Sequence, residues 1–485
     1  MAGLEEDISA LGTASVDKKT KNPNEINWAG ENDQLNPRNW PVGKKWLNLS
    51  VISVMTLSTP LASSMFAPGA PQAMREFHSD NSNLETFVVS IFVLGFAFGP
   101  LLVAPLSEIY GRRPIYVLSN LLFCIFTMAC ALSKSLGMLI AFRFLAGCAG
   151  STPVTLGGAT IGDTFPKDKR GAAMALWGMG PLLGPIIGPI IGGYLSQAKG
   201  WRWVFWLQLI ASGATFVLGL LLLKESYSVV ILEGKAELMR KETGNQDLVS
   251  ALHHGLTRKS HFTHAIVRPT KMLLLSPIVM LLSIYTAFLF GYLYLFITTF
   301  PRVFTGKYHF SVNSSGLAYI GLGVGCFFGL IMAGKGSDVV YKKLEEKNGG
   351  EGKSEFRLPL LVISAPLVAI AFFWYGWSVE AKVHWIIPIL GSALFGMGMM
   401  PGFICINMYL VHSFGVHSAS AIAASKVLQS IGGALLPLVA EPMYDRLGLG
   451  WGNSVLAFIA LAFVPVPWIL FRYGGLLRAR ERARF

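Results

Sequence analysis

The chain has 485 residues, of which 53% are apolar and only 14% are charged, with a mean hydropathy of +0.52. Water-soluble proteins carry roughly 25% charged residues, so this balance excludes a chain with a fully solvated surface. Twelve membrane-spanning helices of about 20 residues would use about half of the chain and leave little room for a soluble catalytic domain. We therefore expect an all-helical membrane protein.

The first 45 residues are polar, and no apolar core of a signal peptide follows their first basic residues. We expect residues 1–45 to remain as a cytosolic tail. Apolar stretches long enough to cross a bilayer then form two groups of six, in residues 46–223 and 272–472. A polar loop over residues 224–271 separates the groups, and a basic tail over residues 473–485 follows. The twelve stretches begin near Trp46, Phe87, Ile115, Met138, Gly171, Trp203, Met272, Gly316, Leu358, Trp385, Ala419 and Asn453.

Basic residues follow the alternation of the predicted loops. With the N-terminus in the cytosol, the cytosolic loops contain most lysines and arginines, among them Arg112, Arg113 and those in residues 335–357. This asymmetry is typical of cytosolic loops, so we expect both termini in the cytosol and the lipid bilayer as a partner. It also accounts for the net charge of +13, and we expect no nucleic-acid partner.

An internal repeat supports two bundles. After the second apolar stretch, Glu108 is followed at +4 and +5 by two arginines, and after the eighth, Asp338 is followed at +4 and +5 by Lys342 and Lys343. Duplicated bundles of this kind place a binding site between the two halves. The pattern predicts two six-helix bundles around a central cavity.

The chain shows no pattern of a catalytic or metal-binding site. Its five cysteines lie in apolar runs without CxxC spacing, so we expect neither a metal site nor a disulfide framework. The motifs GxxxxGK[ST], HExxH and GxSxG are absent. We expect no enzyme activity and no cofactor, and transport driven by an ion gradient or by the solute itself.

Two basic residues lie inside the apolar stretches, Arg143 in the fourth and Lys426 in the eleventh. A charge at the bilayer centre costs about 2.5–3.5 kcal/mol on insertion scales. Arg143 is either a structural charge bonded to backbone carbonyls or a coupling or substrate-orienting cation. Lys426 either faces the cavity or extends toward the cytosol. Asp163 and Glu441 lie near the ends of their stretches, and either could titrate.

The fifth stretch carries small residues at a period of four. Its glycines form a smooth helix face that a neighbouring backbone can approach closely, and its prolines make the helix pliable. A similar stripe lies in the eighth stretch. We expect the two faces to pack across the interface between halves, with ordinary helix packing as the alternative. The residues are Gly180, Gly184, Gly188 and Gly192 with Pro181, Pro185 and Pro189, and then Gly321, Gly325 and Gly329.

Aromatic and sulfur-containing residues in the seventh and tenth stretches are typical of an adaptable apolar pocket, although core packing explains many such residues. Asn407, in the tenth stretch, is a further candidate substrate residue. The sequon at Asn313 falls on the predicted outer loop, where glycosylation is possible. The aromatic and sulfur-containing candidates are Tyr285, Tyr292, Tyr294, Phe395, Met397, Met399 and Met400.

From about Trp28 onward the chain resembles the major facilitator superfamily, specifically its fungal twelve-span drug:proton antiporters. The resemblance rests on four motifs: Asn36-Pro37-Arg38-Asn39-Trp40, the loop Pro105 to Arg113 with Gly111, Arg143 with Gly147, and Gly184-Pro185-Ile186-Ile187-Gly188-Pro189 with Gly192-Gly193. The resemblance implies that the loop stabilises an outward-open state through charge contacts, with Asp163 as a candidate partner. It further implies that Arg143 takes part in proton coupling and that the glycine-proline motif marks an antiporter.

The eleventh stretch departs from the family pattern. Gln429 stands where the family usually has arginine, and Lys426 replaces a neutral residue three positions earlier. Because positions i and i+3 share a helix face, the basic group is moved by about one turn. The relocated cation either orients an acidic or carbonyl-rich substrate or compensates without a change of ligand.

The resemblance implies proton-coupled efflux of a hydrophobic or amphipathic small molecule, such as a drug, toxin or secondary metabolite. We expect a monomer in the plasma membrane. The alternatives are proton-coupled uptake of a nutrient or siderophore-like solute, and a transporter-like receptor that transports nothing.

Overall fold

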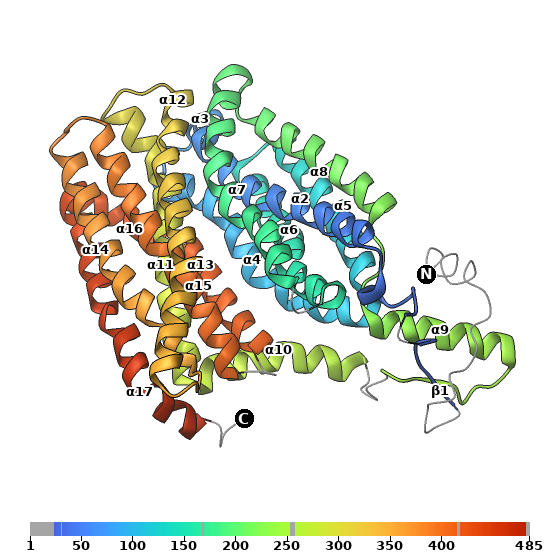
Figure 1. Cartoon of the computed structure of the whole chain (residues 1–485). Helices are drawn as coiled ribbons and strands as arrows, with labels where there is room; N and C mark the ends of the chain where they lie inside the picture. Colours follow the sequence, from blue (N-terminus) through green and yellow to red (C-terminus); the bar gives the residue numbers. More distant parts are fainter. Residues whose placement is uncertain (1–23, 31, 167–168, 253–257, 415–417, 482–485) are drawn as a thin grey trace.

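The computed structural model describes residues 24–30, 32–166, 169–252, 258–414 and 418–481. Two groups of long helices lie side by side (Figure 1). The first group contains α2 (Val42–Met65), α3 (Ala70–Glu76), α4 (Ser82–Tyr110), α5 (Arg112–Ala131), α6 (Leu136–Thr164), α7 (Arg170–Lys199) and α8 (Arg202–Leu222). The second contains α11 (Pro277–Gly306), α12 (Val312–Leu317), α13 (Tyr319–Lys347), α14 (Pro359–Glu380), α15 (Ile386–Phe414), α16 (Ser418–Phe463) and α17 (Pro465–Glu481).

Eleven helical stretches in the described residues are long and apolar enough to cross a membrane, and the last is 59 residues long. That is about three times the usual crossing length. It contains Gly448, whose backbone is not helical (φ 72°, ψ 175°). Just after this break, Leu449 N donates to Glu380 at the end of α14 (3.2 Å), whereas Arg478 binds Glu355 before the start of α14 (2.6 Å). The stretch therefore turns back along α14 and crosses twice, which gives the predicted two bundles of six.

The same helix pairs build both halves. α2 packs along α7 and α4 along α6, as α11 packs along α16 and α13 along α15. Glycines permit the closest approaches: a Cβ at Gly147 would lie 2.0 Å from the carbonyl oxygen of Phe92, and one at Gly325 would lie 1.8 Å from that of Ala393. Small residues at such contacts are typical of membrane helices. The packing confirms the predicted duplication.

The glycine stripes of α7 and α13 do not face each other, and our expectation that they pack across the interface is wrong. A Cβ at Gly192 would lie 1.8 Å from the carbonyl oxygen of Met65 in α2, and Gly180, Gly184 and Gly188 contact the same helix. The stripe of α13 contacts α15. Each stripe lies inside its own half, because a period of four predicts a close approach without specifying the neighbouring helix.

A different face of α7 reaches the second half. A Cβ at Gly193 would lie 2.8 Å from the carbonyl oxygen of Val312 in α12, and Ile186 packs against Gly323 in α13. The fifth crossing therefore borders the interface between the halves.

Hydrogen bonds join the halves at mid-depth and at the end that carries α3 and α12, which we call the α12 end. At the opposite end, crossed by α10 (Arg258–Leu275) and called the α10 end, the ribbons of the halves lie farther apart (Figure 1). Bonds between the halves include Ser63 Oγ with Tyr294 Oη (2.7 Å), Thr86 Oγ1 to Glu441 Oε1 (3.1 Å) and Asn313 N to Gln197 Oε1 (2.9 Å).

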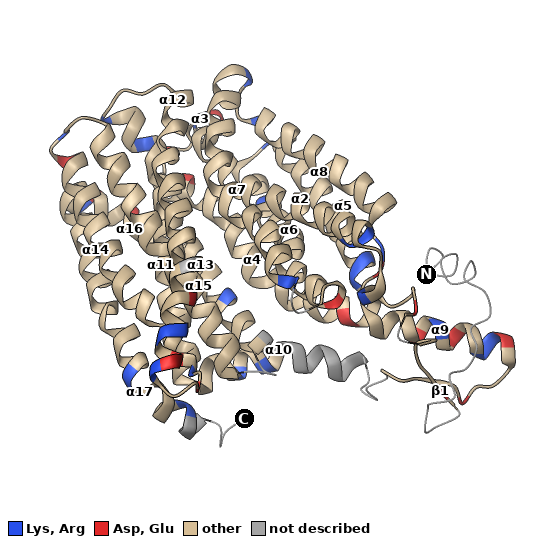
Figure 2. Ribbon diagram, viewed as in Figure 1, with Lys and Arg blue, Asp and Glu red and all other residues tan. Residues whose placement is uncertain are grey.

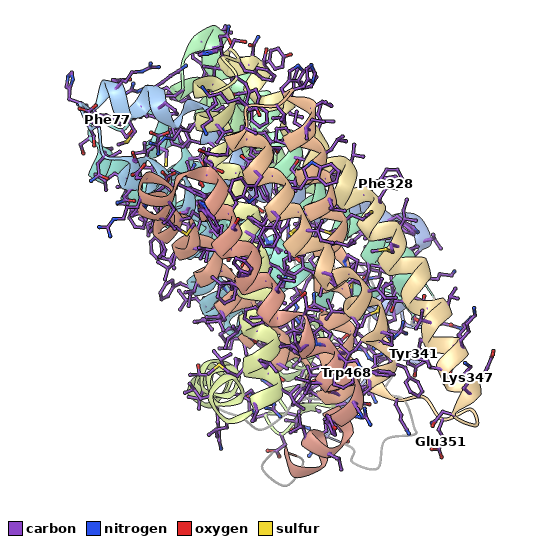
Figure 3. The ribbon with its side chains drawn as sticks, turned by 90° about the vertical axis from the view of Figure 1, so that its left-hand side faces the viewer. Phe77, Phe328, Tyr341, Lys347, Glu351 and Trp468 are labelled. Atoms are coloured by element: carbon purple, nitrogen blue, oxygen red, sulfur yellow. The ribbon has the colours of Figure 1, made fainter. Side chains whose placement is uncertain are left out.

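Figure 3 shows the two ends from the side, with Phe77 near the α12 end and Tyr341 and Lys347 of α13 at the α10 end. Between them, Phe328 projects from the flank of α13 and is 56% exposed. An apolar flank of this kind is typical of a helix that faces lipid.

The described residues before α2 and residues 228–250 of the loop between the halves fold together at the α10 end. The elements are β1 (Glu25–Ile26), β2 (Val249–Ser250) and α9 (Ser228–Thr243). The two strands pair in parallel, and Ile26 packs with Ala236 and Leu248. Lys235 Nζ lies 3.7 Å from Asp33. The sequence predicts a separate tail and loop, because no local pattern links segments about 200 residues apart.

Candidate transport site

Arg143 is buried inside the first half, with 1% of its surface exposed. Its Nε donates to the carbonyl oxygen of Val88 (2.6 Å), and its Nη2 donates to those of Val89 (3.1 Å) and Ser63 (3.1 Å). The guanidinium also lies 5.1 Å from the ring centroid of Phe66. Backbone carbonyls and aromatic rings thus hold the charge, as in the structural alternative for this residue.

Arg143 is nevertheless connected to the interface between the halves. The carbonyl oxygen of Ser63 accepts a hydrogen bond from Arg143, and the hydroxyl of Ser63 forms a hydrogen bond with the hydroxyl of Tyr294 in α11. A displacement of Arg143 would therefore move a residue that contacts the other half.

Lys426 differs from Arg143 in having no oxygen partner among the residues that the structure describes. It lies half-buried on α16, with its ammonium nitrogen 6.0 Å from the ring centroid of Phe403 on α15. Within the described part of the chain it forms no hydrogen bond and no ion pair. The cation therefore has unused donors.

Lys426 lies on the face of α16 that meets the first half. Gly433 follows two helical turns later on the same face. A Cβ at Gly433 would lie 2.7 Å from the ring of Phe290 in α11 and 3.2 Å from Val93 in α4. The cation is thus placed where helices of both halves meet.

Aromatic rings lie beside this cation. Phe290 packs against Tyr294 of the same helix (5.0 Å between ring centroids) and against Phe403 (6.1 Å). Tyr294 in turn reaches Ser63 of the first half. These rings connect Lys426 to the bond between the halves.

Two amide side chains complete the group. Gln429 lies one turn after Lys426 and is 6% exposed, and Asn407 lies half-buried one turn after Phe403. Neither amide forms a hydrogen bond with residues that the structure describes. Apolar walls with a few free polar groups are typical of small-molecule sites. We call the following residues the Lys426 site: Phe290, Tyr294, Phe403, Asn407, Lys426 and Gln429.

Tyr292 lies in the core of the second half, which corrects its assignment as a substrate residue. It is 1% exposed, its hydroxyl donates to the carbonyl oxygen of Leu456 (2.9 Å), and its ring lies 4.5 Å from that of Phe372. Phe395 and Met399 are also fully buried. Neighbouring aromatic residues of α11 point to different faces, and the sequence alone does not separate them.

The loop after α4 contains the expected charge contact. Arg112 Nε lies 3.4 Å from Asp163 Oδ2 at the end of α6, and Arg112 Nη1 donates to Ser107 Oγ (2.5 Å). The guanidinium lies over the ring of Tyr227 (4.8 Å), and burial raises the pKa of Tyr227. Glu108 is exposed and forms neither a hydrogen bond nor an ion pair with described residues.

Glu225 is the residue of this network that sequence reasoning missed. Its carboxylate accepts from the backbone N–H groups of Arg112 (2.9 Å) and Arg113 (3.0 Å) and from the two N–H groups that follow Glu225 itself. Gly111 has φ 96°, and a Cβ there would lie 2.4 Å from the carboxylate. A glycine is therefore required. The partners are about 113 residues apart, so no local pattern reveals them.

The second half has a related network with its charges exchanged. Asp338 pairs with Arg357 (2.6 Å), whose guanidinium lies over Tyr341 (4.3 Å). Arg478, after the last crossing, binds both carboxylate oxygens of Glu355 before α14 (2.6 and 2.7 Å). In the first half the corresponding residue after the last crossing, Glu225, is acidic and binds the start of the third crossing, α5. In both halves, therefore, the end of the last crossing is bonded to the start of the third.

Asn313 lies in the first turn of α12 and not in an open loop. Its amide oxygen accepts from Ser314 N (2.8 Å), and its own N–H donates to Gln197 of α7 (2.9 Å). This half-buried position leaves less room for a glycan than the predicted loop.

The comparisons with known proteins agree with this geometry, which is that of a two-bundle membrane transporter. The family model described as Major Facilitator Superfamily matches residues 52–437. The chain therefore belongs to the major facilitator superfamily and is a multi-pass membrane transporter.

Relatives cover almost the whole chain. It is 48% identical over 481 residues to the efflux pump radE of Floropilus chiversii, covering 99% of this chain and 89% of the relative. It is also 48% identical to the MFS-type transporter penM of Penicillium rubens, covering 97% and 93%. Among solved structures it is similar to the xylose transporter XylE from E. coli in a partially occluded inward-open conformation. The TM-score is 0.65 at 17% identity, with 87% of this chain and 97% of that chain covered. That likeness concerns the fold alone.

Proposed function

We propose that this transporter exports a hydrophobic or amphipathic small molecule by alternating access, in exchange for protons. The observation that carries the proposal is an unpaired cation among aromatic and amide side chains where the two halves meet. The names of relatives such as the efflux pump radE support the direction of transport. The resemblance of the fifth crossing to antiporters supports exchange for protons.

The α10 end faces the cytosol in this proposal. Figure 2 shows lysines and arginines gathered toward that end, and the positive-inside rule assigns such an end to the cytosol. The chain would lie in the plasma membrane with both termini inside and work as a monomer. The bonds at the α12 end then close the outer side, so this conformation faces inward.

The residues take different roles. Lys426, Gln429 and Asn407 contact the cargo, and Arg143 positions Ser63 at the interface. The network of Gly111, Arg112, Arg113 and Asp163 and its counterpart at Asp338 hold cytosolic helix ends together within each half. Glu108, which forms neither a hydrogen bond nor an ion pair with described residues, is available for a charge contact in the outward-open state.

The test is transport in pump-deleted, drug-hypersensitive yeast and in vesicles from it. Cells that express the protein should accumulate less of at least one compound from a chemically broad panel than cells with an empty vector. Inside-out vesicles with an acidic lumen should take that compound up, and a protonophore should abolish the uptake. Release driven by the acidic lumen would instead favour uptake by symport, and unchanged accumulation throughout would favour a receptor.

A further inference from the structure

The half-buried Lys426 differs from the fully buried cations of the described residues. Arg143 donates to three carbonyl oxygens, Arg112 pairs with Asp163, and Lys235 lies near Asp33. In the part of the chain that the structure describes, Lys426 has only the face of the Phe403 ring, at 6.0 Å. A cation at membrane depth without a counter-charge is costly, so its retention needs another source of negative charge.

No carboxylate of the described residues pairs with Lys426. α4, which packs along α16, has acidic residues only near its two ends, Glu85 and Glu108. α2, α7, α11 and α15 contain no aspartate and no glutamate in their sequences. On α16, the nearest acidic residue after Lys426 is Glu441, four turns away and engaged with Thr86 and Arg302. Within the described residues no carboxylate neutralises Lys426, and a bound anion would supply the missing charge.

The side chains beside Lys426 fit an anion with an apolar body. An ammonium group can donate to the oxygens of an acid group, and Gln429 and Asn407, one helical turn from Lys426 and Phe403, carry further amide N–H donors. Phe290 and Phe403 offer ring surfaces to the rest of the molecule. Resting on the export function above, we propose that the cargo is an amphipathic organic anion whose acid group binds Lys426.

Binding of a matched pair of probes to the purified full-length protein tests this. The probes are tritiated 1-naphthoate and its uncharged methyl ester, which share the ring system. The wild-type protein should bind the anion about tenfold more tightly than the ester, the usual scale of one charge-assisted hydrogen bond. Lys426→Gln should lose that preference and bind the ester within twofold of wild type, which also shows that it is folded. Lys426→Arg should keep the preference.

The matched control is Lys134→Gln, which removes the same charge from an exposed turn between α5 and α6. It should behave as wild type. Equal affinities for anion and ester in the wild type, a preserved preference in Lys426→Gln, or no binding of the anion would overturn the proposal. Binding can be measured without an ion gradient. Anion-selective binding by a protein that exports nothing in yeast would therefore contradict the proposed export function but not the anion site.

Discussion

Arg143 and Lys426, the basic residues inside the predicted apolar stretches, show how different a guanidinium and an ammonium are inside a membrane protein. Arg143 offers several donors in a planar fork and meets three carbonyl oxygens of α2 and α4. Lys426 meets an aromatic face and no oxygen among the described residues. The hydrogen bonds of Arg143 stabilise the fold, whereas the ammonium group of Lys426 keeps N–H donors that, in the proposal above, bind the cargo.

Replacement of Arg143 by Met should therefore destabilise the protein. The variant removes the three hydrogen bonds from the guanidinium to carbonyl oxygens. Hydrogen bonds to charged groups contribute about 1.5–3 kcal/mol each to stability. We expect a clearly lower Tm of the purified protein in detergent. A variant with an unchanged Tm that has lost transport would contradict the structural role and favour the coupling role.

Glu225 makes a comparable contribution at the start of α5. Glu225→Ala removes the acceptor of four backbone N–H groups, and we expect a loss of about 3 kcal/mol in the free energy of unfolding. Denaturant unfolding in detergent measures it. Glu346→Ala, at an exposed position on α13, is the control and should change stability little. An equal effect of both variants would refute the capping role.

At the scale of helices, α7 combines a glycine face turned toward α2 with another face turned toward the second half. Gly192→Ala would place its Cβ 1.8 Å from the carbonyl oxygen of Met65, whereas a Cβ at Gly178 meets nothing within 4 Å. We expect Gly192→Ala to lower the Tm and the transport rate and Gly178→Ala to leave both unchanged or raise the Tm. Equal behaviour of the two variants would show that α2 does not approach α7 this closely.

Much of the fold could be predicted from the sequence, because apolar length and the positions of basic residues follow directly from the bilayer. The sequence also indicated that Arg112 and Asp163 belong together, through the family resemblance. It could not identify the helix that packs on Gly192, since many helices can approach a smooth face.

The candidate site was less predictable. Lys426 and Gln429 stood out as departures from the family pattern, but their aromatic surroundings depend on which faces of α11 and α15 turn inward. Tyr292 was misassigned and Glu225 was missed for the same physical reason. Their partners, Leu456 and Arg112, are brought near by the tertiary fold.

For the whole molecule, the central claim is that the halves separate at the α12 end during each transport cycle. The backbone N–H of Asn313 donates there to the side-chain oxygen of Gln197 across the interface (2.9 Å), and neither residue belongs to the Lys426 site. A covalent link at this point should hold the inward-facing state while leaving the interior intact.

The most direct measurement is transport by a double variant, Gln197→Cys with Asn313→Cys, in a chain whose five native cysteines are replaced by serine or alanine. We expect a short bismethanethiosulfonate cross-linker to join the two thiols in the resting protein and to abolish export, and a reductant to restore it, while each single variant stays active after the same treatment. Full export by the cross-linked protein would contradict alternating access through this interface.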